Sequence, residues 1–504
     1  MEVGNVLLLL SLISSFISTT MFFIALKKKN SKYAETAEIA LYFSLSSCFA
    51  SLLILIYYFL TDNFLIEYVY SHSHKTMNVL YKISAVWAGK EGSLLIWSFF
   101  SLLIASLFVS YGKKDLEWLK ASTVLTGIAS YILLITFLES PFHVFSFKPS
   151  DGFGLNPILR TFEMILHPPI IFLAYALAAV PFSMHISNLN AERFAKMTFL
   201  LLSLGIFLGG FWAYKTLGWG GFWAWDPVEN SSLLPWLSIL AYLHSKKARS
   251  FFAYLTFVFV ILATYITRSG IVQSPHAFVG AGGELFLLLI VAATVLAYRN
   301  LKTNFDGFCY TSQIFLAMIV VLLMGIFSSI FYNVSVNYYY FTFLPLFALS
   351  VILILLKARR AILIHLGAIL IFAGAISVWG FEKSYDLTLN PSAKVSDIEL
   401  RFSSLNFSED DEKFVVRSKI ESNLAVFEPE IHFYRKPEKV VQTVNIVSTP
   451  LFDYYLVMEQ FSNEFVKVKF SIIPLISLVW LGCFFIVLGV VFRLLKNRGY
   501  KFII

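Results

Sequence analysis

The chain has 504 residues, of which 58% are apolar, 17% aromatic and only 14% charged, and its mean hydropathy is +0.74. Apolar runs long enough to cross a bilayer recur along most of the sequence, which indicates a polytopic membrane protein and excludes a soluble globular class. The formal charge of +8 follows membrane topology, as argued below, so it does not indicate a nucleic-acid partner.

The apolar runs predict a polytopic α-helical membrane protein with about 13 transmembrane helices and one small β-rich extracytoplasmic domain. We expect a helical bundle over 1–380, the β-rich domain over 381–468, and a last transmembrane helix with a cytoplasmic tail over 469–504. The predicted spans are approximately 3–26, 37–60, 92–111, 121–139, 164–186, 197–214, 230–245, 250–267, 284–298, 311–332, 339–356, 361–379 and 471–492.

Lysine and arginine in the connecting loops predict the orientation. Loops that would share one side carry 21 of these cations, whereas the short loops on the other side carry 7. Because cytoplasmic loops are enriched in Lys and Arg, the N-terminus is expected outside and the C-terminus inside a cell (inner or plasma) membrane. The lysines follow the first apolar run instead of preceding it, so a retained span is expected and not a cleaved signal peptide.

The three cysteines form no redox motif. Cys48 and Cys483 lie within predicted spans, and Cys309 lies in an inner loop. Neither a disulfide framework nor a C-x-x-C thiol relay is therefore expected. Thiol chemistry at the outer face would use the cysteines of a partner.

The first candidate residues occur in outer segments. Trp87 and Trp97 flank a Gly-rich turn and are expected to be interfacial anchors, although they could also form the floor of an outer site. His167 precedes two prolines at the outer start of a span, where the restricted backbone would hold its ring in one posture. Glu163, four residues earlier, could orient that ring. An ordinary interfacial histidine is the alternative.

The stretch 215–230 contains the densest motif, Trp-Gly-Gly-Phe-Trp-Ala-Trp-Asp-Pro-Val-Glu-Asn from position 219. Its three tryptophans could bind a large flat ligand through their faces or lie in the headgroup belt. The glycines favour a ligand, because they let backbone approach a flat surface. Asp226 and Glu229 have the spacing of a helix cap and the acid three residues later, so capping is expected before any chemical role.

Topology sorts four histidines into two pairs. His167 and His276 lie outside, beside the tryptophans, and His244 and His365 lie near the inner face, about 20 Å or more away by helix rise. Ionisable residues within spans are functional candidates. Two separate packing histidines are the alternative for the inner pair.

The segment 381–468 alternates apolar and polar residues, as in Phe414–Arg417, which predicts a small sheet domain. The chain contains no P-loop, dinucleotide fingerprint, nucleophile elbow or H-E-x-x-H motif.

The residues at the outer face suit one kind of ligand. A planar aromatic molecule with a central metal needs flat apolar surface and one or two neutral imidazoles, and histidine commonly holds haem iron. The tryptophans, His167 and His276 would meet both needs. Arg268 and Lys215 are outer cations nearby in the sequence, which could pair with haem propionates or lie at the headgroup level. The inner histidines would hold a separate haem.

The chain resembles a known superfamily in these stretches. The tryptophan-rich stretch followed by Pro235-Trp236-Leu237 is similar to the WWD signature of the CcmF/CcmC/CcsA haem-handling proteins of cytochrome c biogenesis, and within that superfamily it looks like the CcmF haem lyase family. The resemblance covers most of the chain and weakens in the outer β segment. Other stretches similar to that family, in its order, are Glu91–Leu95, Leu155–Pro157, His167–Pro169, Leu243–Ser245, Thr267–Gly270 and His365–Gly367.

The resemblance implies a cytochrome c haem lyase that holds haem at the outer face for thioether attachment to the C-x-x-C-H motif of apocytochrome c. His244 and His365 are implied as ligands of a resident b-type haem, and His167 and His276 as ligands of the substrate haem. The resemblance assigns substrate-haem binding to Trp219, Gly220, Trp223, Trp225 and Arg268, and catalysis to Trp219, Trp223, Trp225 and Asp226.

The implied partners are haem, apocytochrome c, the haem chaperone CcmE, CcmH-type thiol-handling proteins, a quinol reductant and membrane lipids. Two departures stand out: Phe222 and Ala224 occupy positions where bulkier aromatics are expected, and the chain is short for the family. A CcmC-type haem relay without ligation activity is the first alternative. A non-haem transporter, whose tryptophans only form a membrane belt, is the second.

Overall fold

The computed structural model describes residues 2–112, 115–274, 283–298, 308–358 and 360–496. Among these residues, eleven helices are long and apolar enough to cross a membrane. They are α1 (Val3–Lys28), α2 (Ser31–Leu60), α5 (Lys90–Ser110), α6 (Leu116–Leu138), α7 (Phe162–Ile186), α8 (Glu192–Thr216), α10 (Arg249–Ser269), α12 (Tyr310–Ser328), α13 (Val336–Lys357), α14 (Ile362–Phe381) and α15 (Ile476–Lys496).

The other two predicted spans are also helical but differ from a complete span. α9 (Pro227–His244) has the polar residues Glu229, Asn230, Ser231 and Ser232 in its first two turns, and α11 (Leu285–Tyr298) has 14 residues in the described part of the chain. Two short helices that the sequence did not predict, α3 (Glu67–His72) and α4 (Val79–Ala85), fill the loop before α5, and a 3-10 turn, η1 (Pro157–Leu159), precedes α7. The predicted fold class is confirmed, and eleven of the thirteen predicted spans are full-length transmembrane helices within the described part of the chain.

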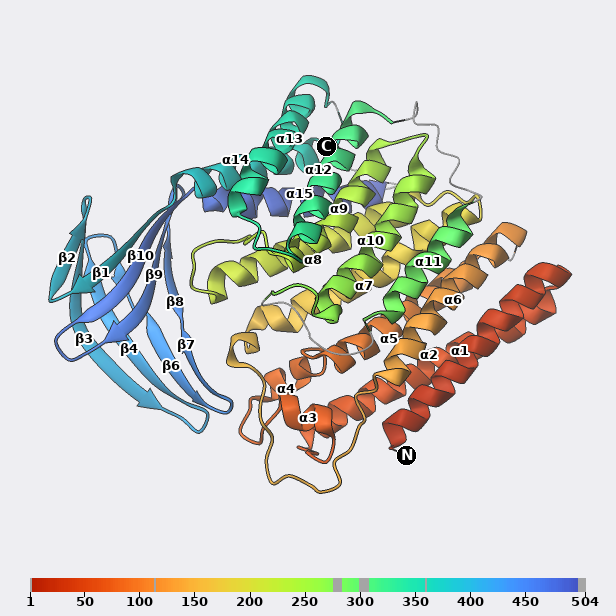
Figure 1. The fold of residues 1–504 in the computed structure, drawn as a ribbon, viewed down its shortest axis with the longest axis horizontal. Coiled ribbons are helices and arrows are strands. Elements are labelled where there is room, and N and C mark those ends of the chain that lie inside the picture. The colour runs from red at the N-terminus through yellow and green to blue at the C-terminus, as the bar shows by residue number, and fades with distance from the viewer. Residues whose placement is uncertain (1, 113–114, 275–282, 299–307, 359, 497–504) are drawn as a thin grey trace.

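The β-rich domain consists of two antiparallel sheets that enclose their own apolar core (Figure 1). One sheet has the order β1-β10-β9-β8, and the other has the order β2-β3-β4-β6-β7 with β5 paired to β4. β10 continues past the predicted end of the segment at 468. The strands are β1 (Lys383–Leu389), β2 (Ser392–Val395), β3 (Ile398–Glu409), β4 (Lys413–Ser422), β5 (Val426–Phe427), β6 (Glu430–Arg435), β7 (Glu438–Gln442), β8 (Val444–Ser448), β9 (Phe452–Phe461) and β10 (Val466–Pro474).

α14 and α15 pack closely because glycines face each other. A Cβ atom on Gly367 would lie 2.5 Å from the carbonyl oxygen of Gly482, and one on Gly482 would lie 2.6 Å from that of Gly367. Small residues at such a crossing let two membrane helices approach closely. α14 leads directly into β1, and β10 leads directly into α15. The two strands pair with each other, beginning with Lys383 opposite Ile472. This helix pair therefore connects the bundle to the β domain.

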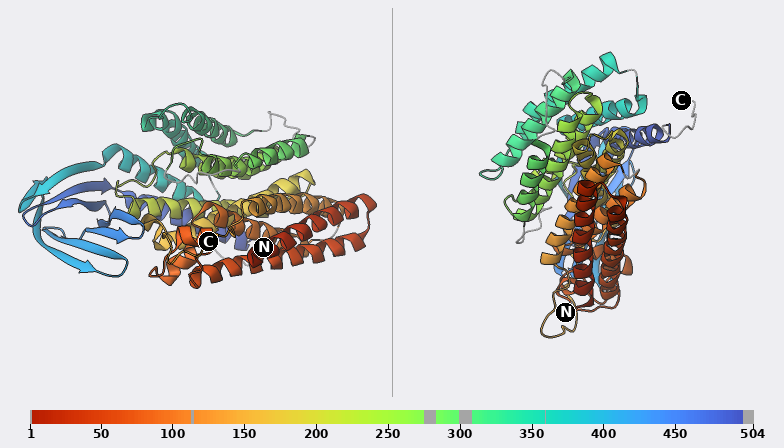
Figure 2. Two further views of the ribbon diagram at one scale, coloured as in Figure 1. Left: turned by 60° about the horizontal axis from the view of Figure 1, so that its bottom comes forward. Right: turned by 90° about the vertical axis from the view of Figure 1, so that its right-hand side faces the viewer.

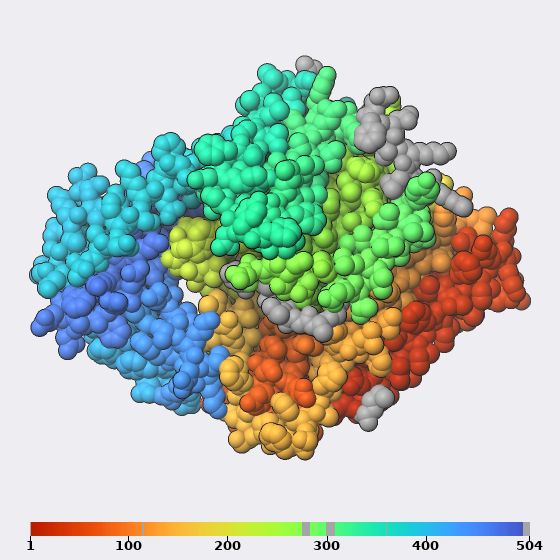
Figure 3. Space-filling model, viewed as in Figure 1, coloured from red at the N-terminus to blue at the C-terminus, as the bar shows by residue number. Residues whose placement is uncertain are grey.

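The β domain lies at one end of the helices, hereafter the β-domain end; the opposite end is the far end (Figure 2). Side-chain hydrogen bonds fix this arrangement: the Tyr214 hydroxyl donates to Asp453 over 2.7 Å, and the Tyr455 hydroxyl donates to the Tyr214 carbonyl over 3.2 Å. Arg160, in the loop before α7, forms an ion pair with Glu412 at 3.0 Å. In Figure 3 the β domain lies directly against the rest of the molecule.

Candidate functional site

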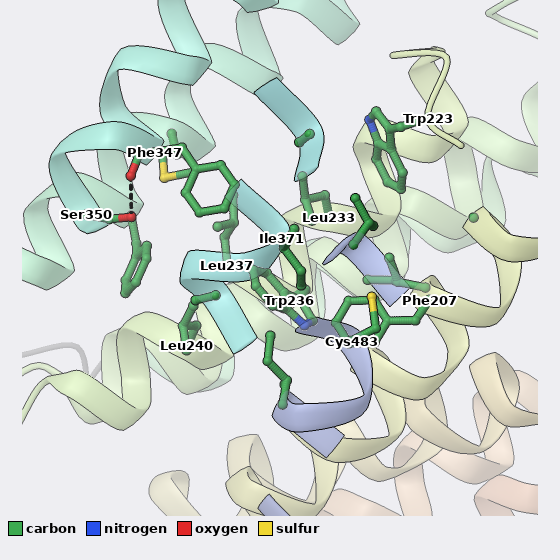
Figure 4. Close-up of a pocket in the computed structure, with 18 of the residues that line it drawn as sticks. Phe207, Trp223, Leu233, Trp236, Leu237, Leu240, Phe347, Ser350, Ile371 and Cys483 are labelled. Atoms are coloured by element: carbon green, nitrogen blue, oxygen red, sulfur yellow. Dashed lines mark hydrogen bonds between the residues drawn. The ribbon is translucent and has the colours of Figure 1, made fainter. Parts of the chain in front are cut away.

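A large apolar cavity, hereafter the main cavity, lies between α8, α9, α12, α13, α14 and α15 (Figure 4). Its empty space is about 1360 Å³ when the open side of the cavity is included. All six helices contribute side chains to its lining, and many of these are aromatic rings. Among those rings are Phe207, Phe222, Trp223, Trp225, Trp236, Phe343, Phe347, Trp379 and Trp480.

His244 and His365 lie at the far end of this cavity. His244 is the last residue of α9, and its Nδ1 is 2.9 Å from the Leu240 carbonyl oxygen. Nδ1 must therefore carry the proton, and Nε2 carries the lone pair that can bind a metal. His365 lies in the first turn of α14. Fourteen residues of α14 separate it from Trp379, which is about 21 Å at 1.5 Å per residue.

The spacing of the two rings suits a metal held between them. Their centroids are 6.3 Å apart, with an angle of 45° between the ring planes. A metal–imidazole bond is about 2 Å long and the nitrogen lies about 1 Å from its ring centre, so two rings that share one metal have centroids about 6 Å apart. Nδ1 of His365 is buried and has no hydrogen-bond partner of good geometry among the described residues, and a buried polar atom of this kind calls for an explanation such as a bound ion. The residues fit a haem iron ligated on both sides.

The tryptophans lie at the β-domain end of the same cavity. Trp225 has a left-handed backbone (φ 59°) and is only 5% exposed, because its ring stacks on Tyr339 with centroids 4.7 Å apart. Trp223 lies perpendicular to it at 6.4 Å. Trp225 is therefore largely a packing residue that presents one edge to the cavity, whereas Trp223 is half-buried.

A second hollow, with about 730 Å³ of empty space when its open side is included, shares Trp223 and Trp379 with the main cavity. We call it the Trp219 hollow; its lining is Trp219, Gly221, Trp223, Ala224, Val336, Tyr340, Val378, Trp379, Glu382 and Ser384. Gly221 accommodates the ring of Trp219, because a Cβ atom there would lie 2.0 Å from that ring. Gly220 has φ 84°, and a Cβ atom on it would lie 3.1 Å from Oε1 of Glu382. Gly221 and Gly220 therefore make room for the side chains of Trp219 and Glu382.

Asp226 caps α9, as the sequence indicated. Its Oδ1 accepts from the Val228 amide at 2.7 Å, and Glu229 completes a capping box by accepting from the amides of Asp226 and Ala224. The catalytic role assigned to Asp226 stays a prediction. Phe222 stacks on Trp379 at 5.4 Å, so it contributes its ring to the wall of the main cavity.

His167 lies beside α8, outside the linings of both cavities. Its Nδ1 is 2.8 Å from the carbonyl oxygen of Gly205, and its ring packs against Gly209. Gly205 and Gly209 are each followed by a residue that lines the main cavity, Ile206 and Gly210 respectively. Gly205 holds Nδ1 of this ring, and Glu163 forms an ion pair with Lys215 at 2.8 Å. An orienting role of Glu163 at the second ring nitrogen stays a prediction. His276 lies outside the described residues.

Arg268 is buried inside the bundle and is only 2% exposed. Its guanidinium donates to the Lys90 carbonyl at 3.0 Å and to the Ser93 hydroxyl at 2.7 Å. The arginine therefore ties the end of α10 to the start of α5 and lines neither cavity.

The interfacial anchor role that the sequence predicted for Trp97 is wrong, because Trp97 is fully buried and stacks on Phe286. Trp87 donates its indole N–H to the Met164 carbonyl at 2.9 Å.

Arg268→Met is expected to destabilise the bundle by about 3 kcal/mol, since each lost hydrogen bond to a charged donor is worth about 1.5–3 kcal/mol. The measurement is the thermal unfolding midpoint of the purified protein. Lys215→Met removes a half-exposed cation with one ion pair and should shift the midpoint far less. Equal shifts for the two variants would contradict this role.

The structure thus brings together Trp223, Trp225, His244 and His365 around one cavity, and Trp219 and Gly220 around its neighbour. The sequence reasoning did not single out Trp379, Trp480, Tyr340 or Glu382. Trp379 and Glu382 lie at the end of α14. Because His365 lies at the start of this helix, the sequence alone could have placed both residues at the opposite end of the bundle. The fold and cavity define a polytopic membrane protein with a large aromatic site that ends in a histidine pair.

Comparisons with known proteins agree with this class. The family described as "Cytochrome C assembly protein" matches residues 87–272. The probable cytochrome c-type biogenesis protein NrfE of Escherichia coli is 30% identical over 80% of this chain and 85% of its own length. The protein of that name from Haemophilus influenzae is 36% identical over 59% of this chain. A solved structure, titled Cytochrome c Heme Lyase CcmF, has the same fold, with a TM-score of 0.79, 20% identity and 97% of each chain covered.

The chain belongs to the CcmF/NrfE family of cytochrome c-type biogenesis proteins. It spans about half the length of the Haemophilus influenzae relatives that it matches, 51% of NrfE and 55% of CcmF.

Proposed function

We propose that the protein is the haem lyase component of a cytochrome c maturation system, which joins haem to the thiols of a C-x-x-C-H motif in apocytochrome c. The main cavity carries this proposal, because it combines aromatic surface at one end with a correctly spaced imidazole pair at the other. The matching fold of a structure titled as a haem lyase supports it.

The imidazole pair is proposed to hold a resident b-type haem through His244 and His365. When bound, such a group would supply one-electron transfer at the far end of the cavity. α9 and α14 hold the two rings at their mutual distance, and the Leu240 carbonyl fixes the tautomer of His244. The side chains that line the path between the histidines and the tryptophans are almost all apolar.

The substrate haem is proposed to bind at the β-domain end. Trp219, Trp223 and Trp225 would orient the porphyrin there, the positive φ of Gly220 holds the Trp stretch in its turn, and His167 and His276 would ligate the iron. The Gly205 carbonyl fixes the tautomer of His167, so its Nε2 is the nitrogen suited to iron. Arg268 is proposed to act by fixing the end of α10.

The β-domain end would face the outside of the cell membrane, with the C-terminus in the cytoplasm. Apocytochrome c would then approach from the β-domain side and supply both thiols. The proposed partners are the haem chaperone CcmE, CcmH-type thiol-handling proteins and a quinol that reduces the resident haem. The proposal of these partners is supported by the chain's membership of the CcmF/NrfE family.

His167→Ala is expected to abolish covalent haem attachment while the resident haem stays bound, because the two sites lie at opposite ends of the bundle. The test is c-type haem staining in cells that lack their own haem lyase and produce a reporter apocytochrome c. His143→Ala, at an exposed histidine outside both cavities, is the control and should stain like the wild type. Normal staining in His167→Ala would refute the assigned role, and a wild type that binds haem without attaching it would favour a haem relay.

A further inference from the structure

Glu382 is a half-buried carboxyl that no predicted role uses. It follows the last residue of α14 and lines the Trp219 hollow. Its Oε1 accepts a hydrogen bond from the Ser384 hydroxyl at 3.3 Å, and among the described residues it forms no ion pair. The carboxyl lies against Gly220, where a side chain would come within 3.1 Å of Oε1. Glu382 is thus held beside the WWD stretch, facing the hollow.

The addition of a thiol to a haem vinyl group needs a proton donor at this place. The proton adds to the terminal vinyl carbon, the sulfur bonds to the inner vinyl carbon, and the double bond becomes single. The thiol proton then restores the donor, so that atoms and electrons balance without an oxidant or a reductant. The donor must be a neutral acid whose proton can reach the substrate.

The neighbouring acids do not meet this requirement. The carboxylates of Asp226 and Glu229 accept backbone N–H hydrogen bonds in the capping box, which stabilise the ionised form. Tyr340 also lines the hollow, but a phenol is a weak acid with a usual pKa of about 10. By contrast, burial raises the pKa of Glu382 above its usual value, although the hydrogen bond from Ser384 and the nearby Lys469 act against this shift.

We infer that Glu382 is the proton donor for thioether formation in the Trp219 hollow. This inference rests on the proposed haem lyase function. The titratable and charged groups around the carboxyl are Lys469 on β10, Tyr340 on α13, Tyr214 on α8 and Tyr455 on β9. None of them replaces a lost carboxylic acid at neutral pH.

Glu382→Gln tests the inference, because it keeps the shape and the acceptor for Ser384 but removes the proton. We expect initial rates of covalent haem attachment to fall about 100-fold, at the lower end of the contribution of a positioned general acid. In the wild type the rate should decline as external pH rises through the pKa of Glu382, and this dependence should vanish in the Gln variant. Glu382→Asp, which keeps an acid, should retain part of the rate and the dependence. Glu399→Gln, at an exposed glutamate of β3 that lines neither cavity, is the matched control and should stay near the wild-type rate.

A readout independent of activity comes from difference infrared spectroscopy of the purified full-length chain during a pH titration. A protonated carboxyl band that titrates above the usual glutamate range should be present in the wild type and absent in Glu382→Gln. Attachment by the Gln variant within twofold of the wild type, or an unchanged pH dependence, would overturn the inference while leaving the lyase function intact. A wild type that attaches no haem would instead refute the proposed function.

Discussion

Purified His244→Ala and His365→Ala variants are each expected to lose the reduced b-type absorption spectrum that the wild type should show. The two imidazoles are 6.3 Å apart across the far end of the main cavity, and among the described residues that line this cavity there is no third imidazole. Removal of either ring would leave haem iron with one protein ligand and the remaining histidine without its counterpart. We expect haem content to fall by at least about tenfold, a loss of about 1.4 kcal/mol or more in binding free energy.

His185→Ala is the matched control for this experiment. His185 also lies in the bundle, in the last turn of α7, but its Nε2 is 2.9 Å from the Tyr242 hydroxyl and it does not line the main cavity. This variant should keep the wild-type spectrum. An unchanged spectrum in both His244→Ala and His365→Ala would refute the proposal that these two histidines bind the resident haem.

Gly367→Ala is expected to disturb the same haem site without touching a ligand. The added methyl group would lie 2.5 Å from the Gly482 carbonyl oxygen, so α14 and α15 would have to move apart. Overpacking of this kind costs about 1–3 kcal/mol, and His365 is only two residues away on α14. A lower unfolding temperature and a lower haem content are therefore expected together, measured on the purified variant by thermal unfolding and by absorption.

Gly380→Ala places the same methyl group on the same helix, where a Cβ atom meets no other atom within 4 Å. It should leave both quantities close to those of the wild type. If the two variants behaved alike, the close crossing of α14 and α15 would not be what positions His365.

The pairing of His244 with His365 could be predicted from the sequence because it depends on local rules. Helix rise and span length fix the depth of each residue in the bilayer, and both histidines do meet in the structure. The cap at Asp226 is equally local, since the hydrogen bonds of a capping box involve only neighbouring residues. The sheet domain followed from the alternation of apolar residues.

Contacts between distant segments could not be predicted in this way. Nothing near Arg268 in the sequence indicates that it bonds to Lys90 and Ser93, 178 and 175 residues earlier. Trp97 was expected at the membrane interface because it lies near a predicted span end, but Phe286 of α11 stacks on its ring and Tyr175 of α7 packs against it edge-on. The ring of Trp225 was expected to face a ligand, whereas Tyr339 on α13 covers one of its faces. These outcomes depend on how helices pack.

The most direct test of the central claim is the electron paramagnetic resonance spectrum of the oxidised, detergent-purified wild type. The account predicts a low-spin ferric haem with two histidine ligands, which would match rings held 6.3 Å apart, and its loss in His244→Ala and His365→Ala. A high-spin haem signal, or protein without haem from haem-replete cells, would contradict the assignment of this cavity to a resident haem.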